Sequence, residues 1–345
     1  MKAFIYIISL LVFSTPLAHA QAGKYSYSEI KMGSPFNIII VSNDSVKANY
    51  LARKSFQLID SLNHIFSNYD SSSELSKINA SAGLLPFKMS PAMLDLIQKS
   101  EQAYIQSKGA YDISIGPLSS LWRNARKSKD FPNTNTVLAT KQLVGLAQVK
   151  INKRLGTIFL PNSGMQLDFG GIAKGYIAQW VIDYLKTSGI QQALADAGGD
   201  IVMSGAPLNN KGWLIGVNLP ETTDDLVHKK LQLSNCAVAT SGDVYQYFEK
   251  EGVKYSHIIN PLTGYGVSNL RNVTIIAKTG ATADWLATAC SILPMKEAKA
   301  LALSNQAALF ISTLRKGKLH FESTPNFKNY WQTTGINQGK KQTKQ

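Results

Sequence analysis

The chain has 345 residues, of which 44% are hydrophobic and 17% are charged, and it carries a formal net charge of +14. This is an ordinary globular composition, long enough for one large domain or two small ones. The basic residues are scattered and form no stripe interleaved with aromatic side chains, so we expect no nucleic acid partner. The positive charge favours an anionic ligand or peripheral contact with an anionic membrane surface, and simple solubility explains it equally well.

The first twenty residues have the pattern of a secretory signal peptide. Lys2 gives a positive start, residues 4–13 are apolar, and residues 18–20 form an A-x-A cleavage site. The apolar run is too short to span a membrane. No cysteine follows the cleavage site, so we expect no lipid anchor of the bacterial type, and no later run is apolar enough to cross a bilayer. We therefore expect an exported, periplasmic, soluble protein.

The first quarter of the chain predicts extended segments followed by a helix. Residues 25–41 are expected to be extended around a turn at 32–35. Residues 46–66 are expected to form a helix, because apolar side chains recur on one face. Residues 67–79 are polar and rich in turn formers, and one of the serines at 71–73 is expected to cap the next helical turn.

The next segment predicts a second helix and then irregular structure. A helix is expected over residues 90–107, where a serine can cap the first turn and a proline follows it. The basic residues of 123–135 predict an irregular surface loop. Strand-like pieces recur at residues 149–151 and 157–160.

The stretch Leu167-Asp168-Phe169-Gly170-Gly171-Ile172-Ala173-Lys174-Gly175-Tyr176 predicts a strand, a glycine turn and a helix that continues to Gly189. Such a turn brings backbone close to a phosphate, because glycine has no Cβ atom and a helix N-terminus favours anions. The spacing matches neither standard nucleotide fingerprint. A purely structural turn therefore remains an alternative.

The second half of the chain alternates strands with helices. A second glycine pair, at 198–199, lies between Asp196 and Asp200. Residues 239–243 are expected to open a helix that carries Tyr245 and Phe248. The remaining elements are strands at 213–217, 231–238, 273–277, 308–312 and 319–322, a strand and proline-led turn over 255–264, and helices at 282–293 and 296–304.

Several polar side chains in these elements suit chemistry. Asp284 and Thr288 lie four residues apart on one helix face, and their oxygens suit Mg²⁺, although such a pair alone is more often structural. His257 has a side chain that serves general base catalysis at neutral pH, with a structural histidine as the alternative. Cys236 and Cys290 lie in apolar contexts, which favours two buried unpaired thiols, while their pairing stays open.

The order of the motifs resembles that of the ApbE-like family of FAD:protein FMN transferases, from about residue 32 to residue 310. The residues that carry the resemblance are Met32-Gly33, Tyr69 with Ser73-Glu74-Leu75-Ser76, Tyr111-Asp112, Gly116-Pro117-Leu118 with Leu121-Trp122, Leu167-Asp168 with Gly175-Tyr176, Gly198-Gly199-Asp200, Ala239-Thr240-Ser241-Gly242, His257-Ile258-Ile259-Asn260-Pro261 with Thr263-Gly264, and Ala283-Asp284-Trp285-Leu286-Ala287-Thr288-Ala289. The resemblance implies an α+β fold: a single mixed α/β domain over residues 21–332, with antiparallel-rich sheets and packed helices, followed by a polar basic tail at 333–345.

The resemblance also implies an activity. The protein would split the diphosphate of FAD, attach FMN by a phosphoester bond to a Thr or Ser of an exported domain of a membrane redox protein, and release AMP. It would bind Mg²⁺ through the carbonyl of Gly171 and the side chains of Asp284 and Thr288. His257 matches a family histidine that assists the acceptor hydroxyl, and with Asp284 it forms the predicted catalytic pair. The implied FAD contacts are Met32, Tyr69, Ala110, Tyr111, Asp112, Asp168, Lys174 and Ile259.

Two other functions stay open, namely an Mg²⁺-dependent FAD pyrophosphatase that gives FMN and AMP, and an exported flavin-binding protein without turnover. Four positions depart from the family pattern, namely Ser34, Asn260, Trp285 and Ala287. Of these, Ala287 leaves open whether one or two metal ions bind. The segment Thr279-Gly280-Ala281-Thr282 is similar to the acceptor motif of flavinylated proteins, and we interpret it as a turn and helix cap.

Overall fold

The computed structural model describes residues 22–217, 230–242, 247–269, 271–315 and 318–332. Its centre is an eight-stranded sheet in which every pair of neighbouring strands is antiparallel, in the order β1-β2-β6-β7-β10-β13-β14-β15. The strands are β1 (Gly23–Lys31), β2 (Ser34–Ser42), β6 (Ala193–Ala197), β7 (Ile201–Ser204), β10 (Cys236–Gly242), β13 (Arg271–Ala277), β14 (Ala308–Arg315) and β15 (Lys318–Ser323).

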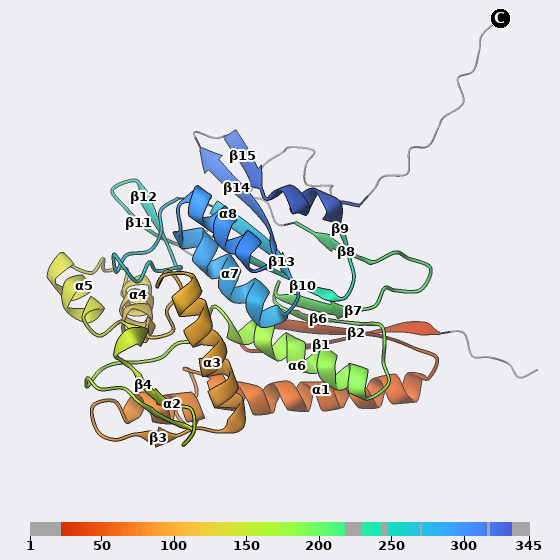
Figure 1. The fold of residues 1–345 in the computed structure, drawn as a ribbon, viewed down its shortest axis with the longest axis horizontal. Coiled ribbons are helices and arrows are strands. Elements are labelled where there is room, and N and C mark those ends of the chain that lie inside the picture. The colour runs from red at the N-terminus through yellow and green to blue at the C-terminus, as the bar shows by residue number, and fades with distance from the viewer. Residues whose placement is uncertain (1–21, 218–229, 243–246, 270, 316–317, 333–345) are drawn as a thin grey trace, which may run out of the picture.

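Helices cover one face of this sheet, as Figure 1 shows. The helices are α1 (Ser45–Phe66), α2 (Glu74–Ala80), α3 (Pro91–Gln106), α4 (Gly116–Ser128), α5 (Thr134–Lys141), α6 (Ala173–Thr187), α7 (Gly280–Ile292) and α8 (Met295–Ser304). Of these, α1, α6, α7 and α8 pack against the sheet strands. The opposite face is covered by a two-stranded ribbon, β8 (Trp213–Gly216) with β9 (Lys230–Leu233), and by the 3-10 helix η3 (Pro325–Tyr330). The sheet therefore separates two hydrophobic cores.

The remaining elements gather at one end of the molecule, around α3, α4 and α5 (Figure 1). They are a three-stranded sheet of β3 (Phe87–Lys88), β5 (Thr157–Phe159) and β4 (Lys150–Asn152), the hairpin of β11 (Tyr247–Lys250) and β12 (Val253–Ser256), and the 3-10 turn η1 (Leu146–Gln148). None of the helices in the described part of the chain has the length and apolar character of a membrane span. Residues 1–20 and 333–345, predicted as leader and tail, lie outside the described residues.

Local sequence signals account for most helix starts. Asp44 accepts a hydrogen bond from Lys47 N, Ser73 from Ser76 N, and Ser90 from Met93 N. Each side chain satisfies a backbone donor that a first helical turn leaves free. The predicted helix over 46–66, the serine cap within 71–73 and the helix over 90–107 are confirmed.

The loop predicted over residues 123–135 was wrong at both ends, because α4 continues to Ser128 and α5 begins at Thr134. Trp122 and Ala125 are buried on one side of this helix. Arg126 and Lys127 lie in its last turn, where positive charge is favoured. The basic composition thus marks the last turn of a helix.

The helix predicted to open at 239–243 was also wrong. Residues up to Gly242 belong to β10, and Phe248 belongs to the strand β11, while Tyr245 lies outside the described residues. Thr240 Oγ1 lies 3.0 Å from Thr274 Oγ1 on the neighbouring strand β13. Tertiary pairing in the sheet here overrides a local sequence typical of a helix start.

Two further strand predictions needed correction. The strand predicted over 231–238 is two strands, β9 and β10, because Asn235 takes a positive φ of 51° and turns the chain between them. The strand predicted before Asp168 makes only one isolated bridge, from Gln166 to Ile115. Leu167 is instead held by the side chain of Asn79, which accepts from its N–H at 2.7 Å and donates to its carbonyl at 3.0 Å.

Candidate active site

Helices α6 and α7 cross at two glycines. A Cβ atom on Gly175 would overlap the carbonyl oxygen of Gly280, and one on Gly280 would overlap the carbonyl oxygen of Gly175. Only residues without a Cβ atom permit this approach. Gly280 N also donates to Gln179 Oε1 at 3.1 Å. The crossing brings the first turn of α6 onto the first turns of α7.

The three predicted metal ligands meet at this crossing. A Cβ atom on Gly171 would lie 2.6 Å from Thr288 Oγ1, so the glycine turn and the threonine are in direct contact. Asp284 Oδ2 accepts a hydrogen bond from Gly175 N at 3.0 Å. Residues more than a hundred positions apart in the sequence therefore lie side by side at the start of α6.

The electrostatics of this site favour a bound cation. Asp284 is only 5% exposed, and burial raises its pKa to about 7, against the opposing effects of the Gly175 hydrogen bond and the positive charge of Lys174. Burial raises the pKa of Asp200 well above its ordinary value, and the negative charge of Asp284 raises it further. Two crowded carboxylates are costly to ionise without nearby positive charge.

The donor set fits Mg²⁺, which prefers hard oxygen ligands and retains several water molecules. Within the described ranges, no three His, Cys, Asp or Glu side chains gather in a way that could hold a metal ion. A metal here would depend on one carboxylate, Asp284, supplemented by the hydroxyl of Thr288 and the carbonyl of Gly171.

Lys174 lies beside two turns of the main sheet. A Cβ atom on Gly198 would be 3.3 Å from Lys174 Nζ and 2.6 Å from Ser34 Oγ. Gly198 belongs to the turn between β6 and β7, and Ser34 follows the two-residue turn formed by Met32 and Gly33. Both residues of that turn have positive φ, 51° and 74°. Lys174 and the loop that contains Met32 thus lie on the same side of the site.

Asp168 lies on the other side of the glycine turn. Its Oδ1 accepts a hydrogen bond from Gly170 N at 2.8 Å, and its Oδ2 lies 3.6 Å from Arg123 Nη2. The guanidinium of Arg123 in turn lies 4.6 Å from the centre of the Tyr69 ring. Tyr69 and Asp168, both predicted FAD contacts, are therefore joined through a residue that the sequence did not single out.

Ala110, Tyr111 and Asp112 are buried behind this site. Asp112 accepts hydrogen bonds from Ser114 N and Oγ and from Leu146 N, so its carboxylate holds two loops together. Tyr111 packs on Trp285 of α7, with 6.1 Å between the ring centres. Burial and the charge of Asp284 raise the Tyr111 pKa well above its ordinary value. Their contacts to FAD remain predictions, and the structure shows them supporting the site from inside.

His257 and Ile259 come from a separate element, the turn after β12. His257 is exposed, whereas Ile259 is buried in a small core with Leu118, Trp122 and Val137. Trp122 Nε1 donates to the carbonyl of Gly264 at 2.7 Å, which ties this turn to α4. The start of α4 packs on Gln166, two residues before Asp168.

Thr279 and Thr282, which the acceptor-like segment contains, form the start of α7. Thr282 N donates to Thr279 Oγ1 at 3.3 Å, and the two hydroxyl oxygens lie 2.8 Å apart. The interpretation of this segment as a turn and helix cap is confirmed.

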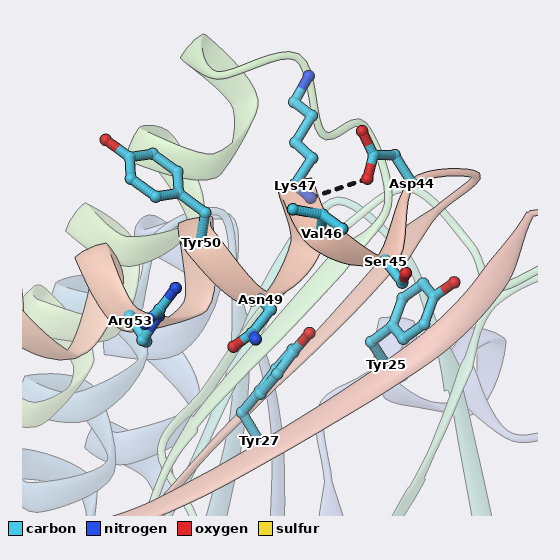
Figure 2. A pocket seen from close by; sticks show the side chains of 9 residues that line it. All are labelled: Tyr25, Tyr27, Asp44, Ser45, Val46, Lys47, Asn49, Tyr50 and Arg53. Carbon is cyan, nitrogen blue, oxygen red and sulfur yellow. Dashed lines mark hydrogen bonds between the residues drawn. The ribbon is translucent and has the colours of Figure 1, made fainter.

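An open hollow of about 910 Å³ lies elsewhere, between β1 and the first turns of α1 (Figure 2). No predicted site residue lines it. Its lining residues are Tyr25, Tyr27, Asp44, Ser45, Val46, Lys47, Asn49, Tyr50 and Arg53.

Three charged residues near the site, Arg123, Arg126 and Asp196, were not among the predicted site residues. Arg123 and Arg126 lie in the segment predicted as a loop, so nothing indicated which way they faced. Asp196 accepts a hydrogen bond from Gly199 N at 2.7 Å and shapes the second glycine turn. The only sequence signal for Asp196 and Asp200 was their position on either side of that glycine pair.

The fold and this site define a family. The ApbE family model matches residues 32–311, and the chain belongs to the ApbE family. It is an enzyme of the transferase class. The resemblance and the α+β fold class predicted from the sequence are confirmed.

Named relatives and solved structures agree with this assignment. The chain is 33% identical over 261 residues to an FAD:protein FMN transferase of Klebsiella pneumoniae, covering 75% of this chain and 79% of the relative. It is 30% identical over 279 residues to one of Vibrio cholerae, covering 80% and 83%. The structure of the flavin transferase ApbE from Vibrio cholerae matches with a TM-score of 0.80 at 27% identity, over 90% of this chain and 100% of that one. The apo flavinyl transferase ApbE of Pseudomonas stutzeri matches with a TM-score of 0.80 at 28% identity, over 90% and 97%.

Proposed function

We propose that this protein is an Mg²⁺-dependent FAD:protein FMN transferase. It transfers FMN from FAD to a Thr or Ser hydroxyl of an acceptor protein, forming a phosphoester bond and releasing AMP. The observation that carries the proposal is the meeting of Gly171, Asp284 and Thr288 at the crossing of α6 and α7, with Lys174 beside them.

Each residue at the crossing has a distinct part. Asp284, Thr288 and the Gly171 carbonyl would hold Mg²⁺. When bound, this ion neutralises charge on the diphosphate oxygens as a Lewis acid. Lys174 adds a positive point charge for the same phosphates. The close contact between Gly171 and Thr288 holds the glycine turn against α7 before substrate arrives.

The transfer step needs a base for the acceptor hydroxyl, and His257 supplies it in this proposal. The hydroxyl oxygen forms a bond to the phosphorus of the FMN half, and the bond from that phosphorus to the bridging oxygen of the diphosphate breaks. The hydroxyl proton passes to the imidazole, and AMP leaves with the bridging oxygen. A general base raises the reactivity of a hydroxyl, which is a weak nucleophile. His257 is exposed, as a residue that meets a protein acceptor must be.

The acceptors proposed are exported domains of membrane redox proteins, and the enzyme is proposed to act in the periplasm. The leader pattern of the first twenty residues supports export of the enzyme, and an exported enzyme requires acceptors on the same side of the membrane. N-terminal sequencing of the protein recovered from a periplasmic extract tests this part. A mature chain that begins at Gln21 is expected, and a full-length chain confined to the cytoplasm would contradict it.

The activity is tested with the purified mature protein, FAD, Mg²⁺ and an acceptor domain that carries a [ST]GA[ST] motif. We expect in-gel flavin fluorescence on the acceptor, one AMP per flavin attached, and loss of both signals with EDTA. An acceptor whose motif hydroxyls are replaced by alanine is the control. AMP release at the same rate with and without acceptor would instead indicate an FAD pyrophosphatase, and absence of FAD turnover with retained FAD binding would indicate a binding protein.

A further inference from the structure

Arg123 connects two residues that lie 99 positions apart in the sequence. Its guanidinium carbon is 4.6 Å from the centre of the Tyr69 ring, and its Nη2 is 3.6 Å from Asp168 Oδ2. Arg123 projects from α4, Tyr69 from the loop between α1 and α2, and Asp168 from the segment before the glycine turn. Arg123 is therefore the residue at which three separate elements meet beside the site.

Tyr69 needs such a partner, because the residue is 79% exposed. The backbone of its loop is already held: Tyr69 N donates to Ser67 Oγ at 3.1 Å, and Ser73 Oγ donates to Ser67 O at 2.6 Å. These bonds do not fix the ring. A guanidinium stacked on an aromatic face restrains it through cation–π attraction, and the planar, delocalised group of arginine suits this better than an ammonium.

The face of α4 that carries Arg123 also carries Arg126. Arg126 Nη1 is buried and has no hydrogen-bond partner among the described residues. Burial and the positive charge of Arg123 lower the pKa of Arg126. This side of the site is therefore electropositive and has a spare donor, which suits an anionic nucleotide more than a neutral one.

We propose that Arg123 is a positioning residue for the nucleotide substrate, which holds the Tyr69 ring and the Asp168 carboxylate in the arrangement that receives FAD. This rests on the proposed function, because that function supplies FAD as the ligand. Tyr69 offers most of its ring surface for stacking, and Asp168 borders the glycine turn that leads into α6. Arg123 acts through these two residues and takes no part in the chemical step.

The test compares Arg123→Gln with Lys127→Gln, an exposed residue of the same helix whose replacement removes the same charge. We expect Arg123→Gln to raise the KM for FAD and its equilibrium dissociation constant roughly 5-fold, with kcat changed less than about 2-fold. Arg123→Lys keeps the charge but not the planar stack and is expected to recover only part of the affinity. Lys127→Gln is expected to resemble the wild type. FAD binding is followed by flavin fluorescence without any acceptor.

A double-mutant cycle with Tyr69→Leu shows whether Arg123 acts through the ring. In the Tyr69→Leu background, Arg123→Gln is expected to change FAD affinity less than about 2-fold. An effect of Arg123→Gln that is undiminished both in that background and in an Asp168→Asn background would overturn the positioning role, and so would an Arg123→Gln variant that binds FAD like the wild type. Equal melting temperatures of the variants exclude a general loss of structure as the cause.

The outcomes for Arg123 and for the proposed function are separable. A wild type that binds FAD but transfers FMN to no acceptor would refute the transferase proposal, while the binding series still tests Arg123. A wild type that transfers FMN normally, with variants unaffected in KM and binding, would refute the role of Arg123 alone. A wild type that binds no FAD would refute both.

Discussion

Thr288 contributes one oxygen to the site, and a substitution of equal size can remove that oxygen alone. Thr288→Val keeps the branched shape that contacts Gly171 but removes the proposed metal ligand. We expect the Mg²⁺ concentration for half-maximal activity to rise at least ~10-fold, because mutations of residues around a bound metal typically lower metal affinity by that amount or more. Thr288→Ser, which keeps the hydroxyl, is the control. An unchanged Mg²⁺ dependence in Thr288→Val would show that this hydroxyl does not bind the ion.

His257 is the residue whose proposed role concerns only the transfer step. His257→Ala is expected to lower the rate of FMN transfer by roughly 10²–10⁴, the usual contribution of a general base, and to leave FAD binding unchanged. His320→Ala, on the exposed edge strand β15, is the matched control. Transfer kinetics and flavin fluorescence measured on the same preparations check both parts. Equal rates for the two variants would refute the role of His257.

Single residues were predictable from the sequence where a local motif carried them. The glycine pair is contiguous and Asp284 and Thr288 are one helical turn apart, so the sequence alone could single them out as candidates. Arg123 was not predictable, because its proposed role rests on contacts with Tyr69 and Asp168 that only the tertiary fold creates.

Among the elements, the crossing of α6 and α7 is the one on which the site depends. Gly175→Ala would force a Cβ atom against the Gly280 carbonyl and the Asp284 side chain. Overpacking of this kind typically costs about 1–3 kcal/mol in the free energy of unfolding. Urea denaturation checks this, with Gly216→Ala as the control, since a Cβ atom there meets no atom within 4 Å. A Gly175→Ala variant as stable as the control would show that the helices can separate without cost.

The elements that the sequence predicted well are those with a strong hydrophobic periodicity and a clear N-terminal capping residue, such as α1 and α3. The predictions from the sequence were wrong for segments whose secondary structure is determined by residues distant in the sequence. β10 continues through Thr240 because β13 lies beside it, although the local sequence is typical of a helix start. The extended segment before Asp168 belongs to no ladder, since Asn79 satisfies its backbone instead.

At the scale of the whole molecule, the sheet keeps the two cysteines apart. Cys290 is buried in the core on the helical face, whereas Cys236 packs against the core on the opposite face. Both are free thiols, which confirms the expectation of two unpaired residues. A disulfide between them would require the sheet to open.

The thiols should therefore be inert in the folded protein. Burial raises the pKa of Cys236 to about 11 and that of Cys290 to about 12, so both remain protonated well above neutral pH. Because the thiolate is the reactive form, we expect no reaction with a thiol reagent at about pH 8 and reaction of two thiols after unfolding in guanidinium. The control is the same sample treated with the reagent before guanidinium is added. Rapid labelling of either cysteine before unfolding would contradict the burial that holds both thiols protonated.

The central claim is that the crossing of α6 and α7 performs FMN transfer, and the intact mass of an acceptor protein tests it most directly. The acceptor is incubated with FAD, Mg²⁺ and either the wild type, Asp284→Asn, or Asp183→Asn. Asp183 is an exposed carboxylate on α6 and undergoes the same chemical change. We predict that the wild type and Asp183→Asn add one FMN to the acceptor and that Asp284→Asn adds none. Equal addition by Asp284→Asn would contradict the claim.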